Sequence, residues 1–143
     1  MTKIISAWPG TGKTYLGRNS DSTIIDFRSG LYSKDDEKII NPNFPENYIG
    51  AMKKIIPNYE IILISCHSVV IDALEKEKIS YTLIYPEIFL KEEYIKRYKN
   101  RANPEGWIQN VANNWEKWIK DFDKLKCNKI KLQKGQYLSD IIC

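Results

Sequence analysis

Short apolar runs alternate with segments of helical spacing along most of the chain. The apolar runs predict five strands, at about residues 3–7, 22–27, 60–65, 81–85 and 129–132. Between them, apolar residues recur at the 3.6-residue spacing of a helix with one buried face, most clearly over 105–125. The other predicted helices cover about 13–18, 43–56, 68–78, 91–101 and 137–142, and Asn43 is expected to cap the second of these.

This alternation predicts one α/β domain with three layers. Strands that alternate with helices through short links form mostly parallel sheets with helices on both faces. The run Ile-Ile-Leu-Ile within 60–65 is apolar at every position, as expected for a strand that is covered on both faces. In such sheets, ligands bind beyond the carboxyl ends of the strands, where the strand order changes direction. Candidate functional residues are therefore those that follow each strand.

Composition and charge exclude only a few classes of protein function. The chain has 143 residues, of which 43% are hydrophobic, which is enough for one core, so we expect a single domain over 1–143. The net charge of +4 suits a phosphate-bearing ligand but is too small to indicate a nucleic-acid partner. No apolar run approaches the ~20 residues of a membrane span, and no signal segment opens the chain. Three cysteines without metal-binding spacing predict reduced thiols in a cytoplasmic protein.

The most specific motif lies at residues 7–14, which read Ala-Trp-Pro-Gly-Thr-Gly-Lys-Thr. This is the A-x-x-x-x-G-K-T form of the Walker A phosphate-binding loop, placed between a predicted strand and a predicted helix as the motif requires. A glycine turn with an exposed lysine would be the plainer interpretation, but strand, loop and helix agree. We expect Lys13 to reach the β- and γ-phosphates of ATP and the Thr14 hydroxyl to hold Mg²⁺. The predicted ATP-binding residues are Pro9, Gly10, Thr11, Gly12, Lys13 and Thr14.

The second strand ends in an acidic and a basic residue, Asp26 and Arg28. The topology aims Asp26 at the ligand crevice beside the phosphate loop. Its carboxylate could accept a proton from an acceptor hydroxyl, or hold Mg²⁺ through water. A strand-end Asp that caps the next turn is the structural alternative.

The third strand ends in Ser65, Cys66 and His67 without a Walker B aspartate, which argues against an ATPase or helicase motor. Ser65 is a candidate contact for phosphate or for a Mg²⁺-bound water. His67 is the only histidine, and its place beside the crevice makes substrate contact and a structural role equal alternatives. Cys66 is expected to be a buried core thiol.

Arg97 and Arg101 lie at i and i+4 of a predicted helix, so one helical face carries both guanidinium groups. Paired arginines on a mobile segment can clamp phosphates during transfer. The alternative is a solvated basic helix in which Glu93 pairs with Arg97. The next helix carries Trp115 and Trp118 on its apolar stripe, and both are expected in the core rather than against a nucleobase.

The order of these parts resembles the nucleoside-monophosphate kinase and shikimate kinase group of P-loop phosphotransferases. The resemblance implies that Lys13 and Thr14 hold the donor phosphates and Mg²⁺, and that Asp26 and Arg28 face the acceptor. It further implies an acceptor-binding segment at 29–56 and a short lid at 87–104 that carries Arg97 and Arg101. The size and the Ile, Lys and Asn usage are similar to those of small nucleotide kinases of phages or low-GC bacteria.

The sequence thus predicts an ATP-dependent kinase that acts on a nucleotide or nucleoside, with ATP and Mg²⁺ as cofactors. The predicted catalytic residues are Lys13, Asp26, Arg97 and Arg101, and the predicted substrate-binding residues are Asp26, Arg28, Ser65 and His67. Two alternatives remain: a polynucleotide 5′-hydroxyl kinase, and a non-catalytic ATP-binding switch or inhibitor protein. We expect no membrane partner, and no residue pattern indicates an oligomeric state.

Overall fold

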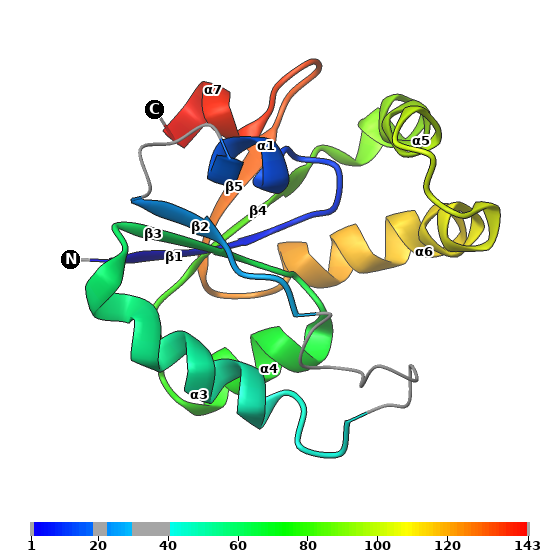
Figure 1. The fold of residues 1–143 in the computed structure, drawn as a ribbon. Helices are drawn as coiled ribbons and strands as arrows, with labels where there is room; N and C mark the ends of the chain where they lie inside the picture. Colours follow the sequence, from blue (N-terminus) through cyan, green and yellow to red (C-terminus); the bar gives the residue numbers. More distant parts are fainter. Residues whose placement is uncertain (1, 19–22, 30–40, 143) are drawn as a thin grey trace.

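The computed structural model describes residues 2–18, 23–29 and 41–142. In this part of the chain, five strands form one parallel sheet in the order β2-β3-β1-β4-β5 (Figure 1). The strands are β1 (Lys3–Ala7), β2 (Ile24–Asp26), β3 (Ile61–Ile64), β4 (Thr82–Pro86) and β5 (Asn128–Leu132). The predicted α/β class and parallel sheet are confirmed.

Helices cover both faces of this sheet (Figure 1). The short helices α1 (Lys13–Arg18) and α7 (Leu138–Ile142) lie on one face. The other face carries α3 (Glu46–Ile55), α4 (Ser68–Lys76) and α6 (Glu105–Asp123), and α5 (Lys91–Asn100) packs against α6. Two 3₁₀ turns, η1 (Ile56–Asn58) and η2 (Ile88–Leu90), precede β3 and α5.

Strand β3 shows how the apolar runs build two cores. Ile62, Leu63 and Ile64 are fully buried, as the continuous apolar run predicts. Successive side chains of a strand point to opposite faces. Leu63 accordingly joins the smaller cluster under α1 and α7, while Ile62 and Ile64 join the larger cluster under α3, α4 and α6. Burial on both faces holds β3 inside the sheet.

Most element boundaries shift by one or two residues from the sequence prediction, and two differences bear on the site. The helix expected at Asn43 begins at Glu46, after a cis peptide bond between Phe44 and Pro45. Asn43 does not cap it through its side chain; its main-chain carbonyl accepts a hydrogen bond from the Asn47 N–H (2.9 Å). Strand β2 is shorter than the predicted 22–27, of which Ser22 lies outside the described residues; beyond its end, the Phe27 N–H still donates to the Leu63 carbonyl (2.8 Å).

The strand order places the end of β1 at the switch point of the sheet. β1 lies between β3 and β4, so the chain that leaves its carboxyl end enters the crevice where ligands bind in open parallel sheets. The loop that follows β1 is the predicted phosphate-binding loop. None of the helices described above has both the length and the apolarity that a membrane crossing requires.

Candidate phosphate-binding site

The loop between β1 and α1 adopts a conformation that two glycines make possible. Gly10 and Gly12 have φ angles of +84° and +93°, a left-handed region that side chains with a Cβ rarely enter. The Thr11 hydroxyl donates a hydrogen bond to the Trp8 carbonyl (2.7 Å), and the Leu16 N–H donates to the Gly12 carbonyl (3.0 Å) to start α1. These two hydrogen bonds fix the shape of the turn without a ligand.

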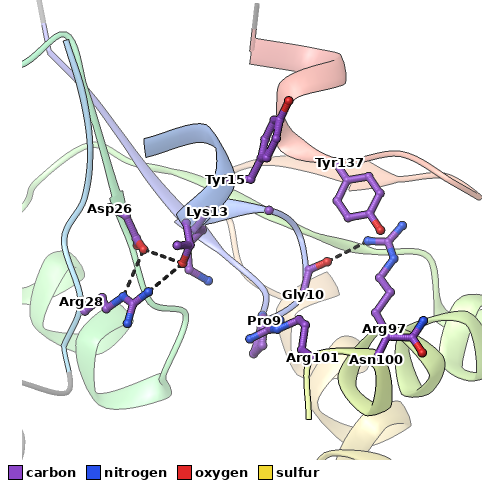
Figure 2. Close-up of a pocket in the computed structure, with 12 residues that line it drawn as sticks. Pro9, Gly10, Lys13, Tyr15, Asp26, Arg28, Arg97, Asn100, Arg101 and Tyr137 are labelled. Atoms are coloured by element: carbon purple, nitrogen blue, oxygen red, sulfur yellow. Dashed lines mark hydrogen bonds and ion pairs between the residues drawn. The ribbon is translucent and has the colours of Figure 1, made fainter. Parts of the chain in front are cut away.

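A pocket of about 710 Å³ opens beside this loop (Figure 2). It is formed by the loop, the end of β2, helix α5 and the segment before α7. Its walls include most of the residues that the sequence singled out, together with three that it did not. The lining residues are Pro9, Gly10, Gly12, Lys13, Thr14, Tyr15, Asp26, Arg28, Arg97, Asn100, Arg101 and Tyr137.

Lys13 is half-buried at the floor of the pocket. Its ammonium donates a hydrogen bond to the Ala7 carbonyl at 2.9 Å. Burial lowers the pKa of Lys13, and the positive charges of Arg101 and Arg28 lower it further, although Cys66 and Asp26 act in the opposite direction. A ligand phosphate would supply the negative charge that favours the ionised ammonium. The position and the lowered pKa of Lys13 thus suit the binding of an anion at its ammonium.

Asp26 and Arg28 lie at one side of the pocket (Figure 2), and Thr14 forms one hydrogen-bonded group with them. The Thr14 hydroxyl donates to Asp26 Oδ2 (3.0 Å) and accepts from Arg28 Nη2 (2.9 Å), and Arg28 Nε lies 3.3 Å from Asp26 Oδ2. The Arg28 side chain is 60% exposed, so it can leave this group for a phosphate at small energetic cost.

Close packing between α1 and β2 sets the position of Asp26. A Cβ on Gly17 of α1 would lie 3.1 Å from Asp26 Cβ, a tighter contact than most real Cβ atoms make. On the other side of the strand, the Tyr48 hydroxyl donates to the Phe27 carbonyl and the two rings stack at 4.9 Å. These contacts fix the end of β2 against the phosphate loop.

The oxygens of Thr14 and Asp26 suit Mg²⁺, which prefers hard oxygen ligands. No cluster of three His, Cys, Asp or Glu side chains able to hold a metal occurs among the described residues. Mg²⁺ usually keeps several waters and takes only one or two protein oxygens together with substrate phosphates, so a hydroxyl and one carboxylate fit its requirements.

Arg97 holds the phosphate loop from the side of α5. Its side chain is only 8% exposed. Nη1 donates to the Gly10 carbonyl (2.8 Å), while Nη2 donates to Glu93 Oε2 (2.9 Å) and to the Gln136 carbonyl (3.0 Å). One guanidinium therefore connects the loop, α5 and the segment before α7.

Two aromatic rings enclose the Arg97 guanidinium. Arg101 lies in a different environment, so the two arginines have different roles. The Arg97 Cζ lies 4.3 Å from the ring centre of Tyr94 and 3.9 Å from that of Tyr137. Arg101, one turn later, is exposed and lines the pocket. We infer that Arg97 positions the loop, while Arg101 remains available to a phosphate. The Glu93–Arg97 pair does form, but it is largely buried rather than solvated.

Trp8 and Tyr98 support the loop from behind, and the sequence analysis did not single them out. The Trp8 indole N–H donates to the Tyr98 hydroxyl (2.9 Å), which donates to the Pro9 carbonyl (3.0 Å). Trp8 also packs edge-to-face on Trp115 at 5.3 Å. The sequence signal was a large aromatic residue inside the phosphate loop, where the motif sets no residue type.

Ser65 and His67 lie outside the phosphate pocket. The Ser65 side-chain hydroxyl is buried and has no hydrogen-bond partner among the described residues. His67 borders a second cavity of about 360 Å³. The His67 residue is exposed, but partial desolvation by the surrounding protein lowers the pKa of its imidazole, and the charge of Lys13 lowers it further, which favours the neutral form. Burial raises the pKa of Cys66 to about 11, in keeping with an unreactive thiol.

The two segments implied by the family resemblance are described in part. Residues 30–40 of the expected acceptor segment 29–56 lie outside the described residues, whereas Ser29 is buried and α3 packs on the core. The expected lid at 87–104 contains η2 and α5, and Tyr94 and Tyr98 fix this segment to the core because both rings are fully buried.

No model of a known protein family and no curated protein sequence matches this chain significantly, so its own residues and geometry carry the functional inference.

The contact between Gly10 and Tyr98 gives a prediction about stability. A Cβ at Gly10 would lie 2.8 Å from the Tyr98 ring, whereas one at Gly135 would meet nothing within 4 Å, although Gly135 also has a positive φ of +76°. Both Gly10→Ala and Gly135→Ala should lose about 1–2 kcal/mol from backbone strain. Gly10→Ala should lose about 1–3 kcal/mol more from overpacking. Urea unfolding measures both, and equal losses would contradict the packing of Tyr98 on the loop.

The lowered pKa of His67 gives a prediction about pH. The pKa of His67 lies below 6.5 in the folded protein, so the unfolded chain binds more protons below that pH. The contribution of His67 to stability is therefore complete above pH 6.5 and is lost as the pH falls toward the folded-state pKa. Urea unfolding between pH 7.5 and 5.5 should show this decline in the wild type and a smaller one in His67→Asn. Identical profiles would contradict a lowered pKa of His67 in the folded protein.

Proposed function

We propose that this protein is an ATP-dependent phosphotransferase of the P-loop fold, and that its acceptor is a nucleotide or a nucleoside. One observation carries the proposal. The phosphate loop at the switch point of the sheet shares a pocket with the Thr14–Asp26 pair and with two arginines, Arg28 and Arg101. The free cysteines Cys66 and Cys127 are compatible with a cytoplasmic location, which we include in the proposal.

The donor phosphates would lie in the loop. The positive φ angles of Gly10 and Gly12 turn the backbone so that its N–H groups can surround an anion. Lys13 would place its ammonium against the same phosphates. A pocket of about 710 Å³ lies within the range of sites that hold cofactors and substrates.

Thr14 and Asp26 would hold Mg²⁺ next to these phosphates, and when bound it would neutralise charge on the transferring group. The chain's own cations add to this effect. Lys13, Arg28 and Arg101 border the same pocket and can stabilise the charge on the equatorial oxygens of the phosphoryl group. Because phosphoryl transfer depends mainly on positioning and charge stabilisation, this set is chemically sufficient.

The role of Asp26 depends on the acceptor. If the acceptor is a hydroxyl, its oxygen forms the new bond to phosphorus, the bond to ADP breaks, and the carboxylate of Asp26 takes the hydroxyl proton. If the acceptor is itself a phosphate, its oxygen is already ionised and no base is needed. Arg28 and Arg101 would then bind that phosphate.

A transfer assay tests the proposal. Mg·ATP is offered with each ribo- and deoxynucleoside monophosphate, each nucleoside and a 5′-hydroxyl oligonucleotide. We expect transfer to one class of small acceptor, and none with Lys13→Ala. Arg101→Ala should slow transfer by at least about tenfold, since it removes one charge that stabilises the transferring group. Lys99→Ala, on the same helix but outside the pocket, is the matched control and should be unchanged.

Two further results test the role of Asp26 and distinguish between the proposed classes of protein. Asp26→Asn should lower the transfer rate by at least about 100-fold if the acceptor is a hydroxyl, and a near-neutral effect would exclude a base role. Transfer to the oligonucleotide alone, with steep salt dependence, would indicate a polynucleotide kinase instead. Tight ATP binding with no transfer to any acceptor would contradict the kinase proposal and favour a non-catalytic switch protein.

A further inference from the structure

A second cavity lies on the other side of the phosphate loop, between the start of α4 and helix α6. Its volume is about 360 Å³. Three of the four tryptophans of the chain border it, namely Trp8, Trp107 and Trp118. Trp8 is buried, whereas Trp107 and Trp118 are half-buried. The cavity therefore has walls of indole rings.

The cavity is a hollow at the surface rather than an interior void, because His67, Asn110 and Asp121 in its lining are exposed. Trp115, on the same stripe of α6, is fully buried and follows the sequence prediction. Trp118 was also expected in the core; it packs against the core but is only half-buried, and it borders the cavity together with Trp107, which lies about three turns earlier on α6. Aromatic walls around a cavity are typical of sites for planar organic ligands.

The polar residues at this cavity differ from those of the phosphate pocket. They include the imidazole of His67, the hydroxyl of Ser68, the amide of Asn110 and the carboxylate of Asp121. The Asp121 side chain is 53% exposed and pairs with Lys117 at 3.4 Å. A carboxylate repels phosphate and accepts hydrogen bonds from N–H groups. The chemistry of this cavity therefore suits an uncharged ring that carries N–H donors.

The two cavities meet at one residue of the loop. Pro9 borders both of them. A ligand with a phosphate or hydroxyl at one end and a ring at the other could thus reach from the indole walls to the phosphate loop.

We propose that this cavity binds the nucleobase of the phosphoryl acceptor, a planar nitrogen heterocycle with an amino or imino N–H group directed to Asp121. The inference rests on the proposed phosphotransferase function and names the part of the acceptor that the protein recognises. The indole rings would supply stacking, and Asp121 with Asn110 would select the hydrogen-bonding edge of the base. The donor nucleotide would occupy the other pocket.

Binding of acceptors without ATP tests this directly. Adenosine, guanosine, cytidine, uridine, thymidine and their monophosphates are titrated by calorimetry, with tryptophan fluorescence as a second readout in the wild type. We expect at least one of them to bind and to quench the fluorescence. Stacking of a base on an aromatic side chain contributes about 1–3 kcal/mol, so Trp107→Leu should weaken that binding by at least about tenfold. The dissociation constant of Mg·ATP should change by less than about twofold, since Trp107 lies outside the phosphate pocket.

Two further variants test whether weaker binding is specific to the residues that border the second cavity. Phe89→Leu is the matched control, because the Phe89 ring is 71% exposed and borders neither cavity, and it should bind as the wild type does. Trp107 packs edge-to-face on Tyr98, so a disturbed fold in Trp107→Leu would be detected by its unfolding curve. Asp121→Asn changes an exposed side chain without opening a core cavity, and it should weaken binding of the preferred base by at least about fivefold, since it removes a charge-assisted hydrogen bond.

The outcomes separate this inference from the kinase proposal. Binding that depends on Trp107 and Asp121, without phosphoryl transfer, supports the base cavity and contradicts the kinase. Transfer to an acceptor whose KM is the same in Trp107→Leu, Asp121→Asn and the wild type supports the kinase and overturns the base cavity. A complete absence of nucleoside and nucleotide binding in the wild type also overturns it.

Discussion

The hydrogen bond from Arg97 to the Gly10 carbonyl connects the phosphate loop to the rest of the protein. A loop that must present its backbone N–H groups to an anion cannot satisfy them internally, so other contacts have to fix its shape. The Tyr98 hydroxyl binds the Pro9 carbonyl, and the Leu138 N–H binds the Thr11 carbonyl. Helix α5 and the C-terminal segment thus hold the loop in its binding conformation before a ligand arrives, which reduces the cost of ordering it.

The same supports divide the surroundings of the loop into two chemically different cavities. On one side, Lys13 and Arg101 border a cationic pocket, where we propose that phosphates bind. On the other side, Trp8 leads into a cavity with indole walls and a carboxylate. Pro9 separates them. A nucleotide has this division in its own structure, with charge at one end and an aromatic ring at the other, and this match links the two proposals.

Local patterns made much of the fold predictable. Apolar runs located the strands, and the motif at 7–14 located the pocket together with Asp26, because parallel strands end at one edge of the sheet. Burial of Arg97 could not be predicted, since it depends on Tyr137, which is distant in sequence and packs on it only in the fold. The cavity beside Trp118 could not be predicted for a similar reason. Helical periodicity identifies the inner face of α6, but it does not show whether the facing loop fills the space next to that face.

Calorimetric titration of Mg·ATP into the wild type and Arg97→Lys tests the central claim, that a loop held in place by Arg97 binds a nucleoside triphosphate. Lysine keeps the positive charge but lacks the planar fork that reaches Gly10, Glu93 and Gln136 together. The account predicts one binding site in the wild type and at least about tenfold weaker binding in a cooperatively folded Arg97→Lys, a change of about 1.4 kcal/mol. No binding by the wild type, or equal affinity in both proteins, would contradict it.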